Sequence, residues 1–156
     1  MSKNLDFSKL LERVLKFISI RPRSQKEIID YLQKKVPQKK DLQEKILKEI
    51  ENLGLVDDQA FACWWVEQRN TFRPKGKKAL FYELRQKGVD NLIIEEILAK
   101  GLDELSLAYQ LSQKRWPSFQ KLPPQIAREK LAGFLLRRGF NWEIISKTLD
   151  KITKKQ

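Results

Sequence analysis

The sequence predicts an all-α protein, and three observations indicate this. Apolar residues recur at steps of three and four, which places them on one face of a helix, as at Leu11, Val14, Leu15 and Ile18. No segment shows a convincing alternation of polar and apolar residues, the pattern of a half-buried strand. Helix-start and helix-end signals separate the apolar runs into nine helices in three sets. We therefore expect three tandem three-helix units in an elongated array, whose curvature the sequence leaves open.

The first expected unit comprises residues 1–56. Its second helix should begin after Ser24, because Ser24 and Glu27 have the spacing of a capping box, in which each side chain binds the other residue's backbone amide. The segment 36–40 is interpreted as a linker to a third helix, and Gly54 as the left-handed residue that ends this helix.

The second expected unit comprises residues 57–102. Asp57 or Asp58 should cap its first helix, because short acidic side chains accept hydrogen bonds from free amides at a helix start. A basic loop with proline and glycine, residues 73–76, then separates this helix from a second one that ends at Gly88.

The third expected unit comprises residues 103–156. Asp103 should open its first helix, and we expect Pro117 to stop that helix because proline lacks the amide that would continue it. Pro124 fits the first turn of the next helix, and Asn141 is the expected cap of the last one.

Internal repetition supports this organisation. Six residues recur at one constant offset: Leu84, Gly88, Val89, Ile93, Ile94 and Leu98 match Leu135, Gly139, Phe140, Ile144, Ile145 and Leu149. A second register aligns 57–62 with 103–108, and its continuation pairs Arg69 with Arg115. The first unit fits more loosely, because a linker with lysines replaces the glycine turn. Stacked helical repeats form extended surfaces that usually bind long partners.

Composition limits the partners and the location. The chain has 32 basic and 20 acidic residues, a formal net charge of +12, which favours polyanions or acidic surfaces. Its single cysteine, Cys63, cannot form an intramolecular disulfide, which fits a reducing compartment. The first ten residues have no long apolar run, so we expect neither a secretory signal nor a membrane association. We expect a cytoplasmic protein.

The residue inventory argues against an enzyme. The chain has no histidine and one cysteine, so the usual zinc sites and Ser-His or Cys-His machinery cannot be assembled. No phosphate-binding loop of the Gly-x-x-x-x-Gly-Lys-Ser/Thr type is present. The pairs Asp57-Asp58 and Glu95-Glu96 are interpreted as caps and helix neighbours, since adjacent helical side chains diverge. We therefore expect no catalytic activity, cofactor or metal.

Four motifs in the same order resemble those of the RecX family: Arg23–Ile28, Leu53–Ala62, Gly76–Leu80 with Glu83–Val89, and Leu135–Phe140 with Ile144-Ile145. The resemblance covers roughly residues 8 to 153, and the linker 36–40 and the pair Trp64-Trp65 have no counterpart in the family pattern. It implies a regulator that binds in the groove of the RecA–DNA filament. Such a regulator bridges protomers and mainly inhibits strand exchange, ATP hydrolysis and coprotease activity in recombination and DNA repair. We expect a monomer, but the sequence leaves the oligomeric state and the direction of the effect on RecA open.

Two groups of basic residues are the candidate surface for the RecA filament and for single- or double-stranded DNA. The densest group is Arg69, Arg73, Lys75, Lys77, Lys78, Arg85 and Lys87, and the second is Arg128, Arg137 and Arg138. Any single lysine of the dense group, taken alone, is better explained by a solvated helix face, so the hypothesis depends on the group as a whole. Arg137 and Arg138 could equally complement the negative end of a helix dipole. Whether DNA is contacted directly stays open.

Aromatic residues and one glycine complete the candidates. The indoles of Trp64 and Trp65 could stack on bases or anchor an interface, but we expect Trp65 in the core and Trp64 nearer the surface. Trp142 is interpreted as a staple on the third unit, and Gly133 as a point of close helix approach.

The alternative is a DNA-binding protein or transcription regulator of the helix-turn-helix type, because a three-helix unit can place one helix in a major groove. Against it, no single helix is markedly richer in Arg, Asn and Gln at base-reading positions. Binding to naked duplex, compared with RecA filaments at two salt concentrations, separates the two hypotheses.

Overall fold

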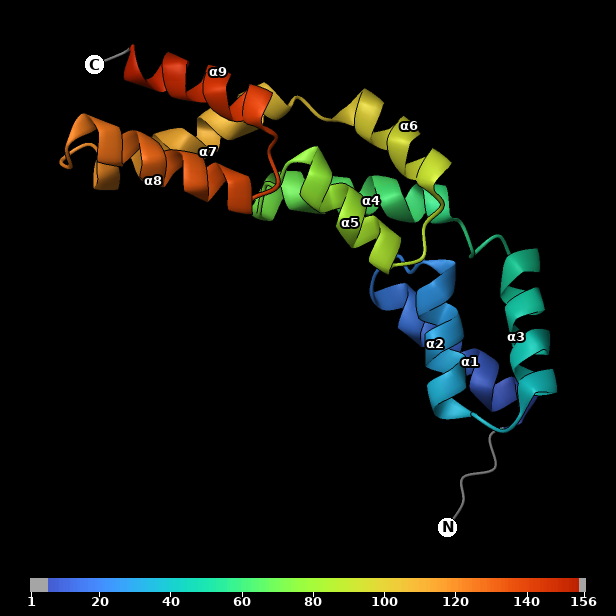
Figure 1. Ribbon diagram of the computed structural model, residues 1–156. Coiled ribbons are helices and arrows are strands. Elements are labelled where there is room, and N and C mark those ends of the chain that lie inside the picture. The colour runs from blue at the N-terminus through green and yellow to red at the C-terminus, as the bar shows by residue number, and fades with distance from the viewer. Residues whose placement is uncertain (1–5, 155–156) are drawn as a thin grey trace. The chain divides into compact units, whose positions relative to one another are not determined.

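The computed structural model describes residues 6–154 and forms nine α-helices in that range, with no strand. This confirms the expected fold class. The helices are α1 (Phe7–Ile20), α2 (Gln25–Lys35), α3 (Lys40–Asn52), α4 (Asp58–Phe72), α5 (Lys77–Gln86), α6 (Asn91–Gly101), α7 (Glu104–Phe119), α8 (Pro124–Arg137) and α9 (Trp142–Thr153). They are labelled in Figure 1.

The helix starts follow the local signals of the sequence. Ser24 forms a complete capping box with Glu27 at the start of α2. Asp103 and Asn141 accept backbone hydrogen bonds at the starts of α7 and α9, as expected. At the start of α4, the Oδ1 atom of Asp57 accepts a hydrogen bond from the amide of Ala60, which identifies Asp57 as the capping residue.

The end of α7 differs from expectation, because the helix continues through Pro117 to Phe119. Pro117 lies in the last turn, where its missing amide removes a single helical hydrogen bond. The residues on either side pack inward, since Trp116 is buried and Phe119 contacts the core. Burial of these two rings outweighs the lost hydrogen bond, so the prediction that Pro117 stops the helix was wrong.

Glycines in the left-handed conformation end α5 and α8, at the two positions that the internal repeat had aligned. Gly88 has φ +80 and Gly139 has φ +91. The amide of Val89 donates to the carbonyl of Leu84 (3.1 Å), and the amide of Phe140 donates to that of Leu135 (3.2 Å). Only glycine adopts this conformation without steric cost, and the resulting bonds satisfy carbonyls at the helix end.

The contacts divide the chain into two compact units. The first includes the chain up to Trp64 together with Leu84–Ile94, and the second includes Trp65–Glu83 and the chain from Glu95 onward. In the first compact unit, α3 packs on α1 and α2. Their shared core consists of Leu10, Val14, Ile28, Leu32, Val36, Ile46 and Ile50.

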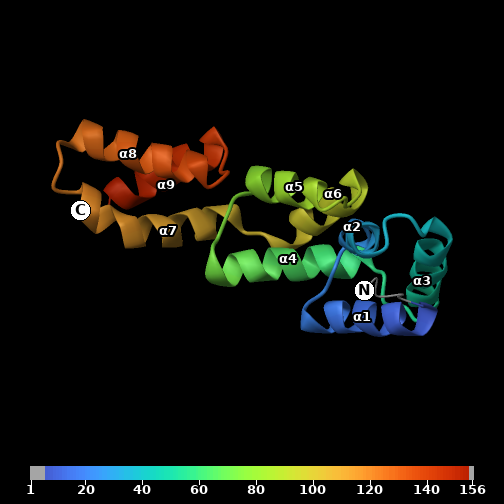
Figure 2. The ribbon, with the colours of Figure 1, turned by 90° about the horizontal axis from the view of Figure 1, so that it is seen from below.

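In the second compact unit, α7 packs on α8 and α9, and Figures 1 and 2 both show these helices side by side. Their core consists of Ala108, Leu111, Trp116, Ala127, Leu131, Phe134, Leu135, Phe140, Ile145, Leu149 and Ile152. Since the partition runs through α4, α5 and α6, the three-unit boundaries 1–56, 57–102 and 103–156 remain a prediction.

Candidate anion-binding site

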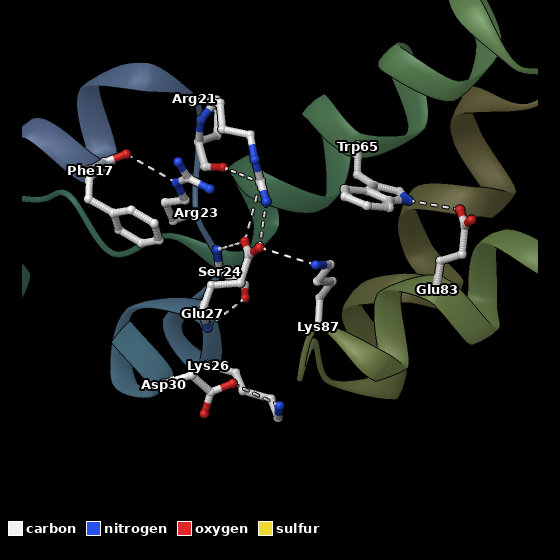
Figure 3. Close-up of polar contacts among 11 residues, drawn as sticks. Phe17, Arg21, Arg23, Ser24, Lys26, Glu27, Asp30, Trp65, Glu83 and Lys87 are labelled. Atoms are coloured by element: carbon white, nitrogen blue, oxygen red, sulfur yellow. Dashed lines mark hydrogen bonds and ion pairs between the residues drawn. The ribbon is translucent and has the colours of Figure 1, made fainter. Parts of the chain in front are cut away.

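Two cations of the dense basic stretch are neutralised within the second compact unit. The carboxylate of Glu83, with 16% of its side chain exposed, forms ion pairs with Arg69 (2.9 Å) and Lys75 (2.7 Å). It also accepts a hydrogen bond from the indole of Trp65 (3.0 Å), shown in Figure 3. Burial raises the pKa of Glu83, but the hydrogen bonds from Lys75, Trp65 and Arg69 outweigh it and leave this pKa below its usual value.

Two further cations of that stretch, Lys87 and Arg85, have partners within the first compact unit. Lys87 and Arg21 both pair with Glu27, as Figure 3 shows, and the Lys87 Nζ–Glu27 Oε2 distance is 3.2 Å. Burial raises the pKa of Glu27, but hydrogen bonds from Arg21, Ser24 and Lys87 hold it below its usual value. Arg85 donates to the carbonyl of Val89 (3.0 Å) at the glycine turn. These cations therefore stabilise the fold locally.

The remaining lysines and Arg128 lie elsewhere. Lys77 and Lys78 line a cavity of about 380 Å³ together with Phe81 and Leu98, in the second compact unit. Arg128 pairs with Asp150 on the surface (3.5 Å).

The tryptophans differ from expectation in part. Trp65 is half-buried rather than a full core residue, because its indole N–H binds the partly exposed Glu83 carboxylate. Trp64 is also half-buried, and the guanidinium of Arg21 lies 5.4 Å from its ring. Trp142 is 67% exposed, so the interpretation as a staple was wrong. It lies in the first turn of α9, and the residues of this turn that contact the core are Ile144 and Ile145.

A different set of arginines comes together with no ion-pair partner among residues 6–154. The arginine cluster consists of Arg73 after α4, Arg115 of α7 and Arg138 at the end of α8. The guanidinium carbons of Arg115 and Arg138 lie 4.9 and 5.2 Å from the ring of Phe134. Burial lowers the pKa of Arg138, and the charges of Arg73 and Arg115 lower it further. Among the described residues, no ion pair involves these three arginines.

Two glycines in close contact hold this cluster together. The amide of Gly76 donates to the carbonyl of Arg138 (2.7 Å), which ties the loop after α4 to the end of α8. A Cβ atom on Gly76 would collide with the backbone of Gly139 and lie 2.7 Å from the amide nitrogen of Phe140. A Cβ atom on Gly139 would lie 2.7 Å from the amide nitrogen of Ala79. The absence of both side chains lets the loop approach and brings Arg73 to Arg138.

A pocket of about 520 Å³ lies beside the cluster, between α7 and α8. Arg115 belongs to both the cluster and the pocket wall. The other lining residues are Phe119, Ile126, Glu129, Lys130, Gly133 and Arg137. The structure thus brings Arg73, Arg137 and Arg138 of the predicted surface into one region.

Sequence reasoning missed Arg115 and Lys130. The signal for Arg115 was present, since the repeat aligned it with Arg69, yet Arg69 has a carboxylate partner and Arg115 has none among the described residues. Nothing in the local sequence marks Lys130, whose position depends on the packing of α8 against α7.

No helix among residues 6–154 combines the length and apolar character needed to cross a bilayer. In the same residues, no group of three or more cysteine, aspartate or glutamate side chains could hold a metal ion.

Comparison with known proteins shows which family has this architecture. Family models for the second and third three-helix domains of RecX match residues 57–98 and 103–149. The chain is 36% identical to the regulatory protein RecX of Chlorobium phaeobacteroides (strain BS1), over 94% of this chain and 95% of that one. It is 35% identical to the RecX of Prosthecochloris aestuarii (strain DSM 271 / SK 413), with the same coverage. The chain belongs to the RecX family of regulatory proteins.

Solved RecX structures have the same fold. The crystal structure of RecX from Lactobacillus salivarius superposes with a TM-score of 0.82 at 24% identity, over 94% of this chain and 96% of that one. A second crystal structure of regulatory protein RecX gives a TM-score of 0.79 at 26% identity, over 92% of this chain and 71% of that one. In terms of the RecX family domains, Arg73 lies in the second, and Arg115 and Arg138 lie in the third.

Proposed function

We propose that this RecX family member regulates RecA by binding in the groove of the RecA–DNA filament, and that it mainly restrains strand exchange, ATP hydrolysis and coprotease activity. The observation that carries the proposal is the arginine cluster on a chain of this regulatory family. Three guanidinium groups without a carboxylate repel one another, and a bound anion removes that repulsion. A filament of protein and DNA presents both phosphates and acidic side chains.

The tandem helical organisation supports a long partner. Several weak contacts on one chain act together, because the first contact raises the effective concentration of the others. The net charge of +12 also speeds encounter with a polyanion at low salt. Lys77 and Lys78, whose ammonium groups form no ion pair among the described residues, would extend the contact surface beyond the cluster.

The test measures inhibition of RecA-catalysed strand exchange and ATP hydrolysis by the intact chain and by a variant with Arg73, Arg115 and Arg138 all changed to Gln. We expect the variant to need at least about tenfold more protein for the same inhibition, because charged hydrogen bonds contribute about 1.5 kcal/mol or more each. The variant should fold, since the changed residues have no ion-pair partner among the described residues. Loss of the contacts of Arg115 and Arg138 with the Phe134 ring should cost about 1–2 kcal/mol, which thermal unfolding measures.

A matched control removes the same charge from exposed positions of the first compact unit: Arg13, Lys34 and Lys48, all changed to Gln. This control should stay within about threefold of the parent chain if position matters more than net charge. Equal inhibition by the cluster variant and the parent chain would contradict the assigned surface. Absence of inhibition by the parent chain would contradict the function itself.

We also infer that the protein acts as a cytoplasmic monomer without catalytic activity of its own. Its regulatory family and the inventory of side chains support this. Hydrolysis of ATP by purified protein in the absence of RecA would contradict it.

A further inference from the structure

We propose that the pocket between α7 and α8 binds one unpaired nucleotide, with its phosphate on the arginine cluster and its sugar and base in the pocket. The ligand class is a nucleoside phosphate, either free or within a single strand. This inference rests on the proposed function for its setting, since a DNA filament is the partner proposed above.

The arginine cluster suits a phosphate. Each guanidinium presents several N–H donors in one plane, and a single guanidinium can donate hydrogen bonds to both oxygens of a carboxylate. Three guanidiniums from different elements instead match an anion with several acceptor oxygens. Arg115 and Arg138 are held in advance on the ring of Phe134, so little side-chain freedom is lost when the anion binds.

Gly133 explains why the pocket exists. A Cβ atom there would meet only the Nη1 atom of Arg137, at 3.3 Å, so no neighbouring helix requires a glycine, and the expectation of close helix approach was wrong. Its φ is not positive, so the backbone does not require glycine either. Glycine within a helix is less stabilising than alanine, because it loses more backbone freedom on folding. Because Gly133 has no side chain, the surface of α8 stays open at this position, beside the Arg137 guanidinium.

The pocket lining suits a base better than an acidic peptide. Phe119 and Ile126 supply apolar surface, and Arg115 and Arg137 supply guanidinium planes on which a base can stack. The carboxylate of Glu129 can accept a hydrogen bond from a base N–H, such as the N3–H of thymine, whereas it repels the carboxylates of a peptide. A paired base is stacked inside its duplex and cannot enter, so we infer an unpaired nucleotide.

The first experiment measures anisotropy of a fluorescently labelled dT15 strand with the full chain and no RecA. We expect Gly133→Leu, which fills the pocket without changing charge, to weaken binding about tenfold. Arg115→Gln should also weaken binding. The slope of log K against log salt concentration should become shallower by about 0.7 for each phosphate that the variant no longer binds. Arg13→Gln, which removes an equal charge from the other compact unit, should leave the affinity within about twofold.

Folding is controlled by a smaller substitution at the same position. Gly133→Ala should raise the melting temperature and keep most of the affinity, because it adds one methyl group and improves helix propensity. Binding of dT15 by Gly133→Leu equal to that of the parent chain would overturn the proposal, provided that its melting curve is unchanged. If Gly133→Leu melts early, an unchanged affinity of Arg115→Gln for dT15 would overturn it.

Competition separates the sources of the ligand. In the parent chain, dTMP should displace labelled dT15 if the pocket takes a free nucleotide, and unlabelled dT15 alone should displace it if the strand is needed. Either result supports binding in the pocket, provided that Gly133→Leu abolishes the same displacement. Equal or better displacement by a 15-base-pair duplex or by a glutamate heptapeptide would overturn it.

Failure of this inference can be distinguished from failure of the proposed function. Gly133→Leu is also tested for inhibition of RecA. If dT15 binding proves independent of the pocket while inhibition by the parent chain persists, the pocket inference is wrong and the regulatory function stands.

Discussion

Replacing Gly76 by alanine should lower the free energy of unfolding by about 3 kcal/mol, a large effect for a single methyl group. The new Cβ atom would collide with the carbonyl of Gly139 and approach the amide nitrogen of Phe140. Both obstacles are backbone atoms, which cannot turn aside as a flexible side chain would. The hydrogen bond from Gly76 to Arg138 would also be strained. Urea denaturation followed by circular dichroism at pH 7 measures the change.

Gly101→Ala is the matched control, because a Cβ atom on Gly101 meets nothing within 4 Å. Since Gly101 is helical, alanine there should leave stability unchanged or raise it by up to about 1 kcal/mol. Similar denaturation midpoints for Gly76→Ala and the parent chain would show that the loop does not lie against the end of α8. Gly76→Ala should also weaken the binding of anions to the arginine cluster, because the hydrogen bond from Gly76 to Arg138 holds the loop that carries Arg73.

Replacing Glu83 by glutamine should destabilise the protein by about 2 kcal/mol at pH 7. Arg69 and Lys75 would lose the carboxylate that neutralises them, and each is only 27% exposed at its side chain. Breaking a fully buried pair costs about 3–5 kcal/mol, and partial exposure reduces this figure. Thermal unfolding of Glu83→Gln beside Glu12→Gln, an exposed glutamate without an ion pair among the described residues, measures the difference.

The same variant should change the acid sensitivity of the fold. The folded-state pKa of Glu83 lies below its usual value, so its stabilisation is complete above the ordinary glutamate pKa of about 4.3 and is lost as the pH falls through the lower folded value. We expect the parent chain to lose stability as the pH falls below about 4.3. Glu83→Gln should lose less over that interval, and a parallel decline in both proteins would contradict the assigned pKa direction. Glu27, whose pKa is also lowered, should account for part of the decline that remains.

The candidate site could be predicted from the sequence only in part. The basic character of the stretch from Arg69 to Lys87 is visible in the sequence, but the ion pairs of Glu83 and Glu27 neutralise several of its cations. Arg73 and Arg138 were among the predicted residues, whereas their association with Arg115 was not. Charge pairing joins residues far apart in the chain, and no local pattern encodes it.

The sequence by itself determined the helices, their caps at Ser24, Asp103 and Asn141, and the glycine turns that end α5 and α8. These features depend on hydrogen bonds and steric limits between residues a few positions apart. Only the tertiary structure decided which arginines stay without a carboxylate, that α7 continues past Pro117, and that Gly133 leaves a pocket open. The reason is physical: burial, ion pairing and free space depend on which elements pack together, and that packing is a property of the whole fold.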